Sequence, residues 1–239
     1  MEPSVLYLAW QAPDAQTDRL RWAVGVIENG PRPTFRYFRA DELPSYNAGR
    51  GLDRLKAAGF VGYPAFLFEA GRTFETDILK TFLRRLPPRS RGDFSQYQEY
   101  FSIHPGSSLS GPLLLALTEA RLPSDGFSIV DPLDPGASEC DAVFEIAGFR
   151  YEAAGRKLEL GDELTLKPEP TNVHDSNAVA VYSGLERVGF VNRLQAPTIA
   201  SWLIGGFVTC QVLRKNGRAD APRAYALVSK RTRPEHMAA

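Results

Sequence analysis

The sequence predicts an α+β protein in two parts, an N-terminal antiparallel sheet with helices and a C-terminal series of strands with one short helix. Three observations lead to this prediction. The first 40 residues hold three apolar runs separated by turn signals, which is typical of a small meander. Residues 76–86 place apolar side chains at helical spacing. From residue 142 onward, short alternating or apolar runs recur between turn signals, as strands do.

The N-terminal elements follow in order. Strands are predicted at residues 5–10, 21–27 and 34–38. A short helix within residues 47–59 and an extended apolar piece within 60–69 come next. Pro87 and Pro88 end the helix at residues 76–86. Asp93 can cap a further helix, and Ser108 or Ser110 can cap another, before a returning strand at residues 127–130.

A linker separates the two parts at residues 131–139, where two prolines, one glycine and three acids show no periodicity. We therefore expect an N-terminal part over residues 1–130, a C-terminal part over 140–232 and a loose tail over 233–239. In the C-terminal part, strands are predicted at residues 142–149, 164–166, 178–182, 188–191, 209–213 and 224–229. A short helix starts near Pro197 and ends at Gly205-Gly206, and Asn216-Gly217 predicts a hairpin turn within residues 214–223.

Composition bounds the possible functions. The chain has 239 residues, of which 44% are hydrophobic and 11% aromatic, enough for a packed core, and its net charge is +0. Charge is uneven, however: residues 187–233 hold nine Lys and Arg against one acid, and residues 139–186 hold ten acids against four bases. This asymmetry fits a basic face for an anionic partner, or merely solvated strands and a basic tail.

Cysteine and histidine give no sign of a metal or disulfide framework. The two cysteines, Cys140 and Cys210, have no ligand spacing, and the three histidines do not cluster. We also find no secretory signal and no apolar run long enough to cross a bilayer. We therefore expect a cytoplasmic protein without cofactors.

One stretch of the C-terminal part carries a recognisable pattern. It comprises Gly-Phe-Arg-Tyr at 148–151, Gly161-Asp162, a polar run from Pro170 to Ala178, and Val188-Gly189-Phe190 before a helix. In this pattern, residues 142–230 resemble the HIRAN domain. The resemblance implies a small β-barrel with a short helix, and it implies binding of single-stranded DNA, best known at a 3′ end.

The same resemblance implies which residues contact DNA. Arg150 and Tyr151 stand where the family contacts phosphate and stacks on a base. Asn172 and Asp175 stand where the family holds the terminal nucleotide, and His174 replaces an aromatic that is usually Tyr. Two further positions complete the predicted DNA-binding set, a basic residue and a second aromatic: Arg193 and Tyr225. Flat rings, cations and short polar groups are what a single-strand end needs.

Structural roles are open for the same residues. Tyr151 can simply be a residue at the mouth of the barrel, and Arg193 a solvated residue at a helix start. Asn172, Asp175 and Asn177 can form Asx turns with their own backbone. A catalytic role is not indicated, because His174 and Asp175 are adjacent and no Gly-x-Ser-x-Gly elbow exists.

The N-terminal half resembles the N-terminal subdomain of HipA-type toxin kinases. The shared residues are Val24-Gly25, Phe35-Arg36-Tyr37, and Phe82 followed by Leu86-Pro87-Pro88. No Gly-rich phosphate loop or kinase-type metal site follows. We therefore predict a non-catalytic single-stranded DNA-binding protein that recognises 3′ ends. The alternative is a protein-interaction regulator that binds a protein partner through its N-terminal half, with the barrel structural.

Overall fold

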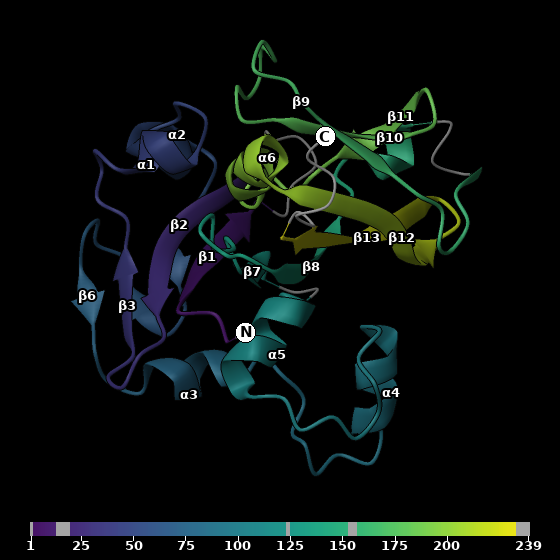
Figure 1. Ribbon diagram of the computed structural model, residues 1–239. Coiled ribbons are helices and arrows are strands. Elements are labelled where there is room, and N and C mark those ends of the chain that lie inside the picture. Colours follow the sequence, from purple (N-terminus) through teal and green to yellow (C-terminus); the bar gives the residue numbers. More distant parts are fainter. Residues whose placement is uncertain (1, 13–19, 123–124, 153–156, 233–239) are drawn as a thin grey trace. The chain divides into compact units, whose positions relative to one another are not determined.

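The computed structural model describes residues 2–12, 20–122, 125–152 and 157–232, so the predicted tail at 233–239 lies outside the described residues. The chain divides into two compact units, Met1–Pro132 and Leu133–Ala239. Each unit combines sheets with short helices (Figure 1). The predicted mixture of strands and helices is therefore confirmed.

Among its described residues, the N-terminal unit has one five-stranded antiparallel sheet in the order β6-β3-β2-β1-β7. Its strands are β1 (Val5–Gln11), β2 (Arg21–Glu28), β3 (Thr34–Tyr37), β6 (Thr73–Phe74) and β7 (Phe127–Val130). Residues 22–27 of β2 are all buried, which explains why this strand reads as a continuous apolar run. The predicted meander and the returning strand, which pairs with β1, are both confirmed.

Short helices and a small hairpin connect these strands. They are α1 (Leu43–Tyr46), α2 (Leu52–Ala57), β4 (Gly62–Tyr63), β5 (Phe66–Leu67), α3 (Ile78–Leu83), α4 (Phe94–Tyr100) and α5 (Gly111–Thr118). Of the two predicted serine caps, Ser110 is the one used: its Oγ accepts the Leu113 N–H at 3.3 Å. Helix α1 was not predicted, because four residues are too few to show a helical period.

Aromatic side chains fill the core of the N-terminal unit. The Phe35 ring is fully buried, with ring centroids of Phe66, Phe74 and Phe82 within 6 Å. The hydroxyl of Tyr37 donates to the Phe66 carbonyl at 2.7 Å and accepts an N–H at 2.8 Å. Burial raises the pKa of Tyr37 to about 12. The aromatic strand β3 is therefore a core element of this unit.

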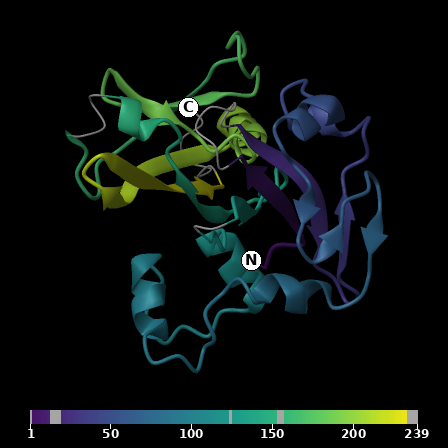
Figure 2. The same cartoon turned by 180° about the vertical axis from the view of Figure 1, so that it is seen from behind.

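The C-terminal unit holds two three-stranded antiparallel sheets within its described residues, β11-β10-β9 and β12-β13-β8. Figure 2 shows them from behind, with the long ribbon of β12 and β13 in yellow tones. The elements are β8 (Cys140–Glu145), the 3₁₀ turn η1 (Phe149–Tyr151), β9 (Thr165–Pro168), β10 (Val179–Ser183), β11 (Glu186–Phe190), α6 (Ala196–Gly205), β12 (Phe207–Arg218) and β13 (Ala221–Arg231). One core joins them, with Phe144, Val181 and Trp202 among its buried members.

The predicted β-barrel does not close as a continuous ladder over the described residues. Outside the named strands, isolated bridges join Ala147 with Phe190 and Glu163 with Gln211. A few backbone hydrogen bonds also join the segment before β9 to β12, such as the Leu164 N–H to the Cys210 carbonyl at 2.8 Å. The segments that carry these bridges bend at glycines with positive φ, Gly148 at 81° and Gly161 at 87°. The strands therefore enclose a shared core without forming one continuous ladder over the described residues.

A hairpin turn lies within residues 214–223 as predicted, but its tip is not at Asn216-Gly217. Both residues lie within β12, where Asn216 pairs with Arg223 and Gly217 with Pro222. The turn comes after Arg218, which pairs with Ala221. The cross-strand pairing of polar residues extends the ribbon past the local turn signal, so tertiary context overrides the dipeptide preference.

Much of the predicted linker packs on the C-terminal unit. Ala137 is buried, and Leu133 contacts the core of this unit. The Trp202 indole donates its N–H to the Asp134 carbonyl at 3.0 Å. Residues 133–137 are therefore held by contacts, whereas composition alone indicated a flexible segment.

Candidate nucleic-acid interface

Arg150 and Tyr151 lie in η1, immediately after the turn that follows β8. Gly148 turns the chain with φ at 81°, and the buried Phe149 side chain anchors the turn in the core. Tyr151 is 74% exposed. The Arg150 guanidinium carbon lies 4.5 Å from the Tyr151 ring centroid, and an Arg150 N–H donates to the Tyr151 hydroxyl. The pair presents a cation and an aromatic ring together on the surface.

A second cation and ring lie beside η1, on β11. The carboxylate of Glu152, the residue after η1, pairs with Arg187 of β11 at 3.2 Å. The Arg187 guanidinium carbon lies 4.9 Å from the ring centroid of Phe190. η1 also lies against β11 and β13. Arg187 and Phe190 are not in the predicted DNA-binding set, because only the folded structure shows that they lie close to η1.

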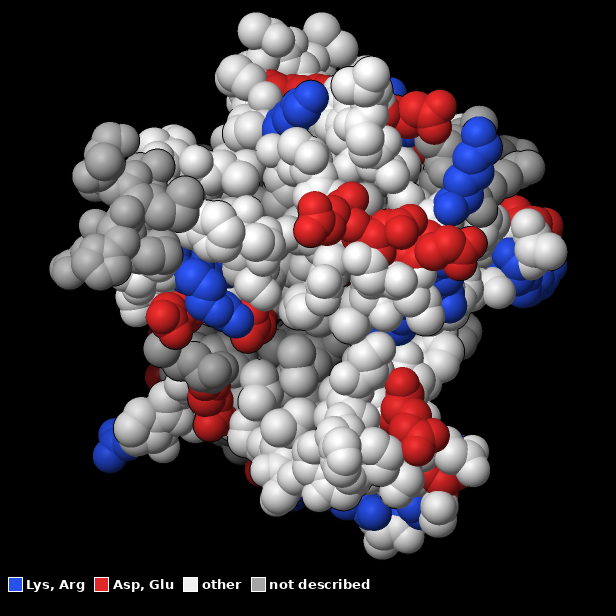
Figure 3. Space-filling model, turned by 45° about the vertical axis from the view of Figure 1, so that its right-hand side comes forward, with Lys and Arg blue, Asp and Glu red and all other residues white. Residues whose placement is uncertain are grey.

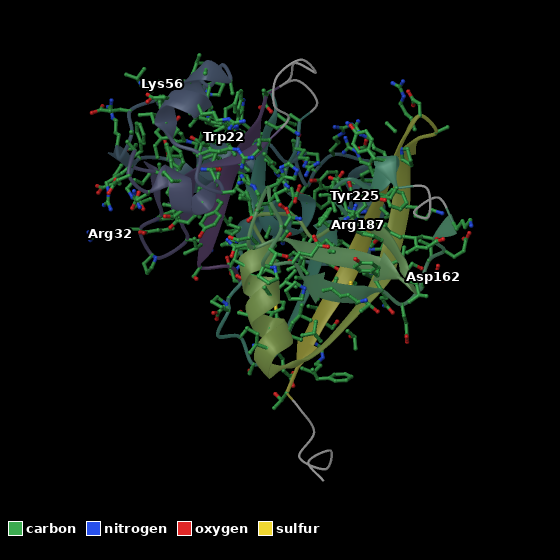
Figure 4. All side chains as sticks on the ribbon, turned by 90° about the horizontal axis from the view of Figure 1, so that it is seen from above. Trp22, Arg32, Lys56, Asp162, Arg187 and Tyr225 are labelled. Carbon is green, nitrogen blue, oxygen red and sulfur yellow. The ribbon has the colours of Figure 1, made fainter. Side chains whose placement is uncertain are left out.

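Tyr225 lies on β13, the other strand that η1 borders. It pairs with Glu145 of β8 on one side and Arg214 of β12 on the other. The guanidinium carbon of Arg214, a buried residue, lies 3.9 Å from the Tyr225 ring centroid. Arg223, two residues before Tyr225 on the same face, pairs with the Glu145 carboxylate at 3.7 Å. Figure 4 labels Arg187 and Tyr225 on this unit.

The predicted polar loop joins β9 to β10 and is built on Asn172. Its Oδ1 accepts the N–H groups of His174 at 3.0 Å and Asp175 at 3.3 Å. Its Nδ2 donates to the Glu169 carboxylate at 2.9 Å. Asn172 therefore has a turn-forming role in this loop, one of the two roles that the sequence left open.

Asp175 continues the same pattern. Its Oδ1 accepts the Asn177 N–H at 2.9 Å, and its carbonyl accepts the Ala178 N–H at 3.0 Å. The Glu169 N–H closes the loop onto the Ala178 carbonyl at 2.8 Å. This Asx bond uses one carboxylate oxygen, and a carboxylate has a second acceptor. His174 is exposed at the tip of this fixed loop.

Arg193 follows β11 at the same end of the sheet as this loop. The Val191 N–H donates to the carbonyl of Val179, the first residue of β10 after the loop, at 2.9 Å. The buried Asn192 then turns the chain, since its Oδ1 accepts the Leu194 N–H at 3.2 Å. Arg193 is half-buried between this turn and α6. Arg193 therefore lies near the start of a helix, as its structural alternative expected, but it is half-buried rather than solvated.

The seven predicted residues therefore lie in two groups joined by β11. Arg150, Tyr151 and Tyr225 surround η1, near the Arg187 end of the strand. The other group comprises the polar loop and the segment after β11: Asn172, His174, Asp175 and Arg193. Arg187 and Val191 are separated by roughly 13 Å of extended chain. A ligand that contacts both groups would have to be extended rather than compact.

Charge on the surface is mixed. The face drawn in Figure 3 carries both basic and acidic side chains, so it is not a uniform basic patch.

Within the described residues, no group of three or more His, Cys, Asp or Glu is placed to hold a metal ion. Burial raises the pKa of the Cys210 thiol to about 12. None of the described helices is long and apolar enough to span a membrane.

Comparisons with known proteins give one family match and two similar solved structures. The family model of the HIRAN domain matches residues 141–227. A crystal structure of the HIRAN domain of human HLTF is similar at a TM-score of 0.32 and 17% identity, over 38% of this chain and 74% of that chain. A crystal structure of a protein from Lactobacillus plantarum is similar at a TM-score of 0.32 and 19% identity, over 38% of this chain and 98% of that chain.

No curated protein matches the chain. The family match lies within the C-terminal unit, so it gives no support to the HipA resemblance of the N-terminal half. The resemblance drawn from Gly148–Tyr151, the polar loop and Val188–Phe190 is confirmed, because the family match spans all three. Residues 141–227 of this chain therefore match the HIRAN domain family.

Proposed function

We propose that this protein binds single-stranded DNA through its HIRAN domain and performs no catalysis. The observation that carries the proposal is the Arg150–Tyr151 pair, an exposed ring with a guanidinium 4.5 Å from its centroid, within the region that matches the family. Single-strand binders combine aromatic faces for bases with cations for phosphates. This pair supplies both at one position.

The surface around η1 extends this chemistry. Tyr225 offers a second ring on β13, and Arg214 lies 3.9 Å from its centroid. A base that stacks on Tyr151 would lie beside a cation able to contact its phosphate. Phosphate contacts supply affinity without sequence preference, and they make binding weaken as salt rises.

We propose that the polar loop recognises a free 3′ end. Asn172 and Asp175 use part of their hydrogen-bonding capacity to fix the loop. The remaining carboxylate acceptor of Asp175 would take a hydrogen bond from the terminal hydroxyl. His174, exposed beside it, would stack on the terminal base with a smaller ring than the usual Tyr. The Asx turns and end recognition are compatible, because the turns preorganise the same polar groups.

Titration with two oligonucleotides tests this end recognition. The 239-residue protein should bind a single strand with a free 3′-OH more tightly than the same strand with a blocked 3′ end. Asp175→Ala should remove the preference while leaving weak binding to both. Asp175→Asn keeps an acceptor for the Asn177 N–H and so controls for loss of the turn. Equal affinity of the wild type for the free and the blocked 3′ end would indicate that the loop is only a structural turn.

The absence of catalysis is a proposal from residue types. The sequence offers no paired nucleophile and base at a recognised spacing. Purified protein should therefore neither hydrolyse ATP nor cut DNA above background. Turnover that disappears in Asp175→Asn would contradict the proposal and place a reaction at the loop.

A further inference from the structure

The sheet β11-β10-β9 has one face in the core and one face turned away from it. Val179 and Val181 of β10 and Val188 of β11 are fully buried in the core of the C-terminal unit. Alternate residues of a strand point to opposite faces, so Tyr182 of β10 lies on the outer face. Tyr182 is half-buried there, opposite Thr165 of β9 and Arg187 of β11.

Cations and rings alternate across this outer face. The Lys167 ammonium of β9 lies 4.5 Å from the Tyr182 ring centroid. Arg187, which pairs with Tyr182 in the register, has its guanidinium carbon 4.9 Å from the ring centroid of Phe190. A bulge in β11 allows this second contact, because the register shifts between Val181 and Tyr182.

The row continues to η1. Arg187 is bound by the Glu152 carboxylate at 3.2 Å, and Glu152 directly follows the Arg150–Tyr151 pair. Lys167 is exposed, and the Arg187 side chain is 42% exposed. One acid that contacts this face, Glu152, moderates its charge.

Cross-strand contacts of this kind stabilise a sheet by modest amounts, about 0.2–1 kcal/mol each. The stability of a sheet does not require exposed cations. An outer face that binds no partner could carry charged side chains of either sign. Here both strands that flank Tyr182 contribute a cation, and each cation lies against a ring. This alternation is complementary to a single strand, whose bases offer flat faces and whose phosphates are negative.

We propose that the outer face formed by Lys167, Tyr182, Arg187 and Phe190 is a second nucleotide-binding track, which carries the DNA strand away from the η1 surface. The inference rests on the proposed function and adds where the rest of the strand runs. Tyr182 stacks on a base, and Lys167 and Arg187 contact phosphates. Arg187 exchanges its exposed pair with Glu152 for a phosphate at little cost, since exposed pairs are weak.

Affinity measured against strand length tests the track. The 239-residue protein is titrated with oligothymidylates of about four, eight and twelve nucleotides, within the roughly 4–16 nucleotides that one OB fold covers. Wild-type affinity should rise with length. Tyr182→Ala should weaken binding of the longest strand roughly tenfold and leave the shortest nearly unchanged. Lys167→Ala should lower the slope of log K against log salt by about 0.7 with the longest strand.

Two controls match these changes away from the track. Phe207→Ala removes a half-exposed ring from β12, and Lys80→Ala removes an exposed cation from α3. Both should bind all lengths like wild type. The track is overturned if wild-type affinity is the same at every length, or if Tyr182→Ala behaves like Phe207→Ala. If no length binds at all, the proposed function itself fails, which is a distinct result.

Discussion

Tyr151 is the residue on which the proposed binding depends most. Its ring is 74% exposed, yet its position is fixed, because the neighbouring Phe149 is buried and Arg150 contacts its face. A rigid exposed aromatic loses little freedom when a ligand stacks on it. Exposure alone does not assign a binding role, because single exposed apolar side chains are common on monomers. The reason to propose stacking on Tyr151 is that a guanidinium lies beside its ring within the region that matches the family.

Tyr151→Ala should weaken single-stranded DNA binding by about 1–3 kcal/mol, the usual contribution of one base–aromatic stack. The salt dependence should change little, because the cation of Arg150 remains. Fluorescence anisotropy with a labelled strand measures both quantities. Tyr100→Ala, which removes a 54% exposed ring from the N-terminal unit, is the control. Equal effects of the two substitutions would argue against Tyr151 as a stacking residue.

Glu119 gives a pH-dependent prediction. Its carboxylate lies 2.8 Å from Arg21 and 2.7 Å from Arg121. Burial raises the pKa of Glu119, but the two guanidinium charges outweigh burial and lower it to about 2. A carboxyl with a depressed folded-state pKa stabilises the fold above its unfolded value and loses this contribution as pH falls toward the folded value.

As pH falls from about 4.5 to 2, the free energy of unfolding of the wild type should therefore decrease by on the order of 3 kcal/mol through Glu119. Glu119→Gln has no carboxylate at this position and cannot lose this contribution. Urea unfolding at pH 7 and pH 3 measures the difference. The variant should be less stable than wild type at pH 7, and the gap should narrow at pH 3. Glu75→Gln, at an exposed position, should show no such narrowing. A constant gap across this range would show that the ion pairs do not set the pKa.

The sequence predicts the roles of neighbouring residues better than the roles of residues that meet across strands. Arg150 and Tyr151 could be selected as an adjacent cation and aromatic. The pairing of Lys167 with Tyr182, and of Arg214 with Tyr225, could not, because each joins two strands whose register only the fold sets. For Asn172 and Asp175 the sequence left two roles open, and the hydrogen bonds of the loop show the turn-forming one.

Among the strands, β11 carries a glycine, Gly189, at the place where the two sheets of the C-terminal unit meet. It lies in β11 with φ at 143°, next to the bridge between Ala147 and Phe190. A β-carbon at this position would lie 2.5 Å from the Ala147 carbonyl oxygen and 2.6 Å from a methyl group of Ile146. Both clashes fall on the segment that carries the bridge.

Gly189→Ala should therefore destabilise the protein by about 1–3 kcal/mol, from backbone strain and displacement of the bridge. Urea unfolding gives the change in free energy. Gly205→Ala is the matched control, since no atom lies within 4 Å of its would-be β-carbon and it is in the last turn of α6. That control should be neutral or slightly stabilising. Equal stability of the two variants would show that the junction tolerates a side chain.

Strands were predicted correctly from the sequence where they coincide with a long continuous run of apolar residues. The strands β1, β2 and β10 coincide closely with predicted runs because their burial follows the sequence pattern. The turn at Asn216-Gly217 failed because ribbon pairing extends to Arg218 and Ala221. Closure of the barrel could not be judged from the sequence, since it depends on how many bridges form between two sheets.

For the whole molecule, the boundary between the two units gives a prediction. The two units divide between Pro132 and Leu133, inside the expected boundary at residues 131–139, and Leu133 and Asp134 contact other residues of the C-terminal unit. A fragment of residues 131–239 should fold alone with a well-dispersed amide spectrum. A fragment of residues 139–239 should melt at a lower temperature, because it loses this burial and the hydrogen bond to Trp202.

Trp202→Phe in the longer fragment removes the indole N–H and keeps most of the apolar packing. It should lower the melting temperature by part of the difference between the two fragments. A poorly dispersed spectrum of the longer fragment would contradict an independent C-terminal domain. Identical melting of the two fragments would show that residues 131–138 contribute nothing.

We propose that this 239-residue protein binds single-stranded DNA through the region that matches the HIRAN domain. Equilibrium titration of a labelled single strand with a free 3′ end, and of the matching duplex, tests it most directly. The predicted result is saturable binding to the single strand that weakens as salt rises, is stronger than binding to the duplex, and is reduced in Tyr151→Ala. Absence of saturable binding at low salt, or binding unchanged in Tyr151→Ala, would contradict the claim.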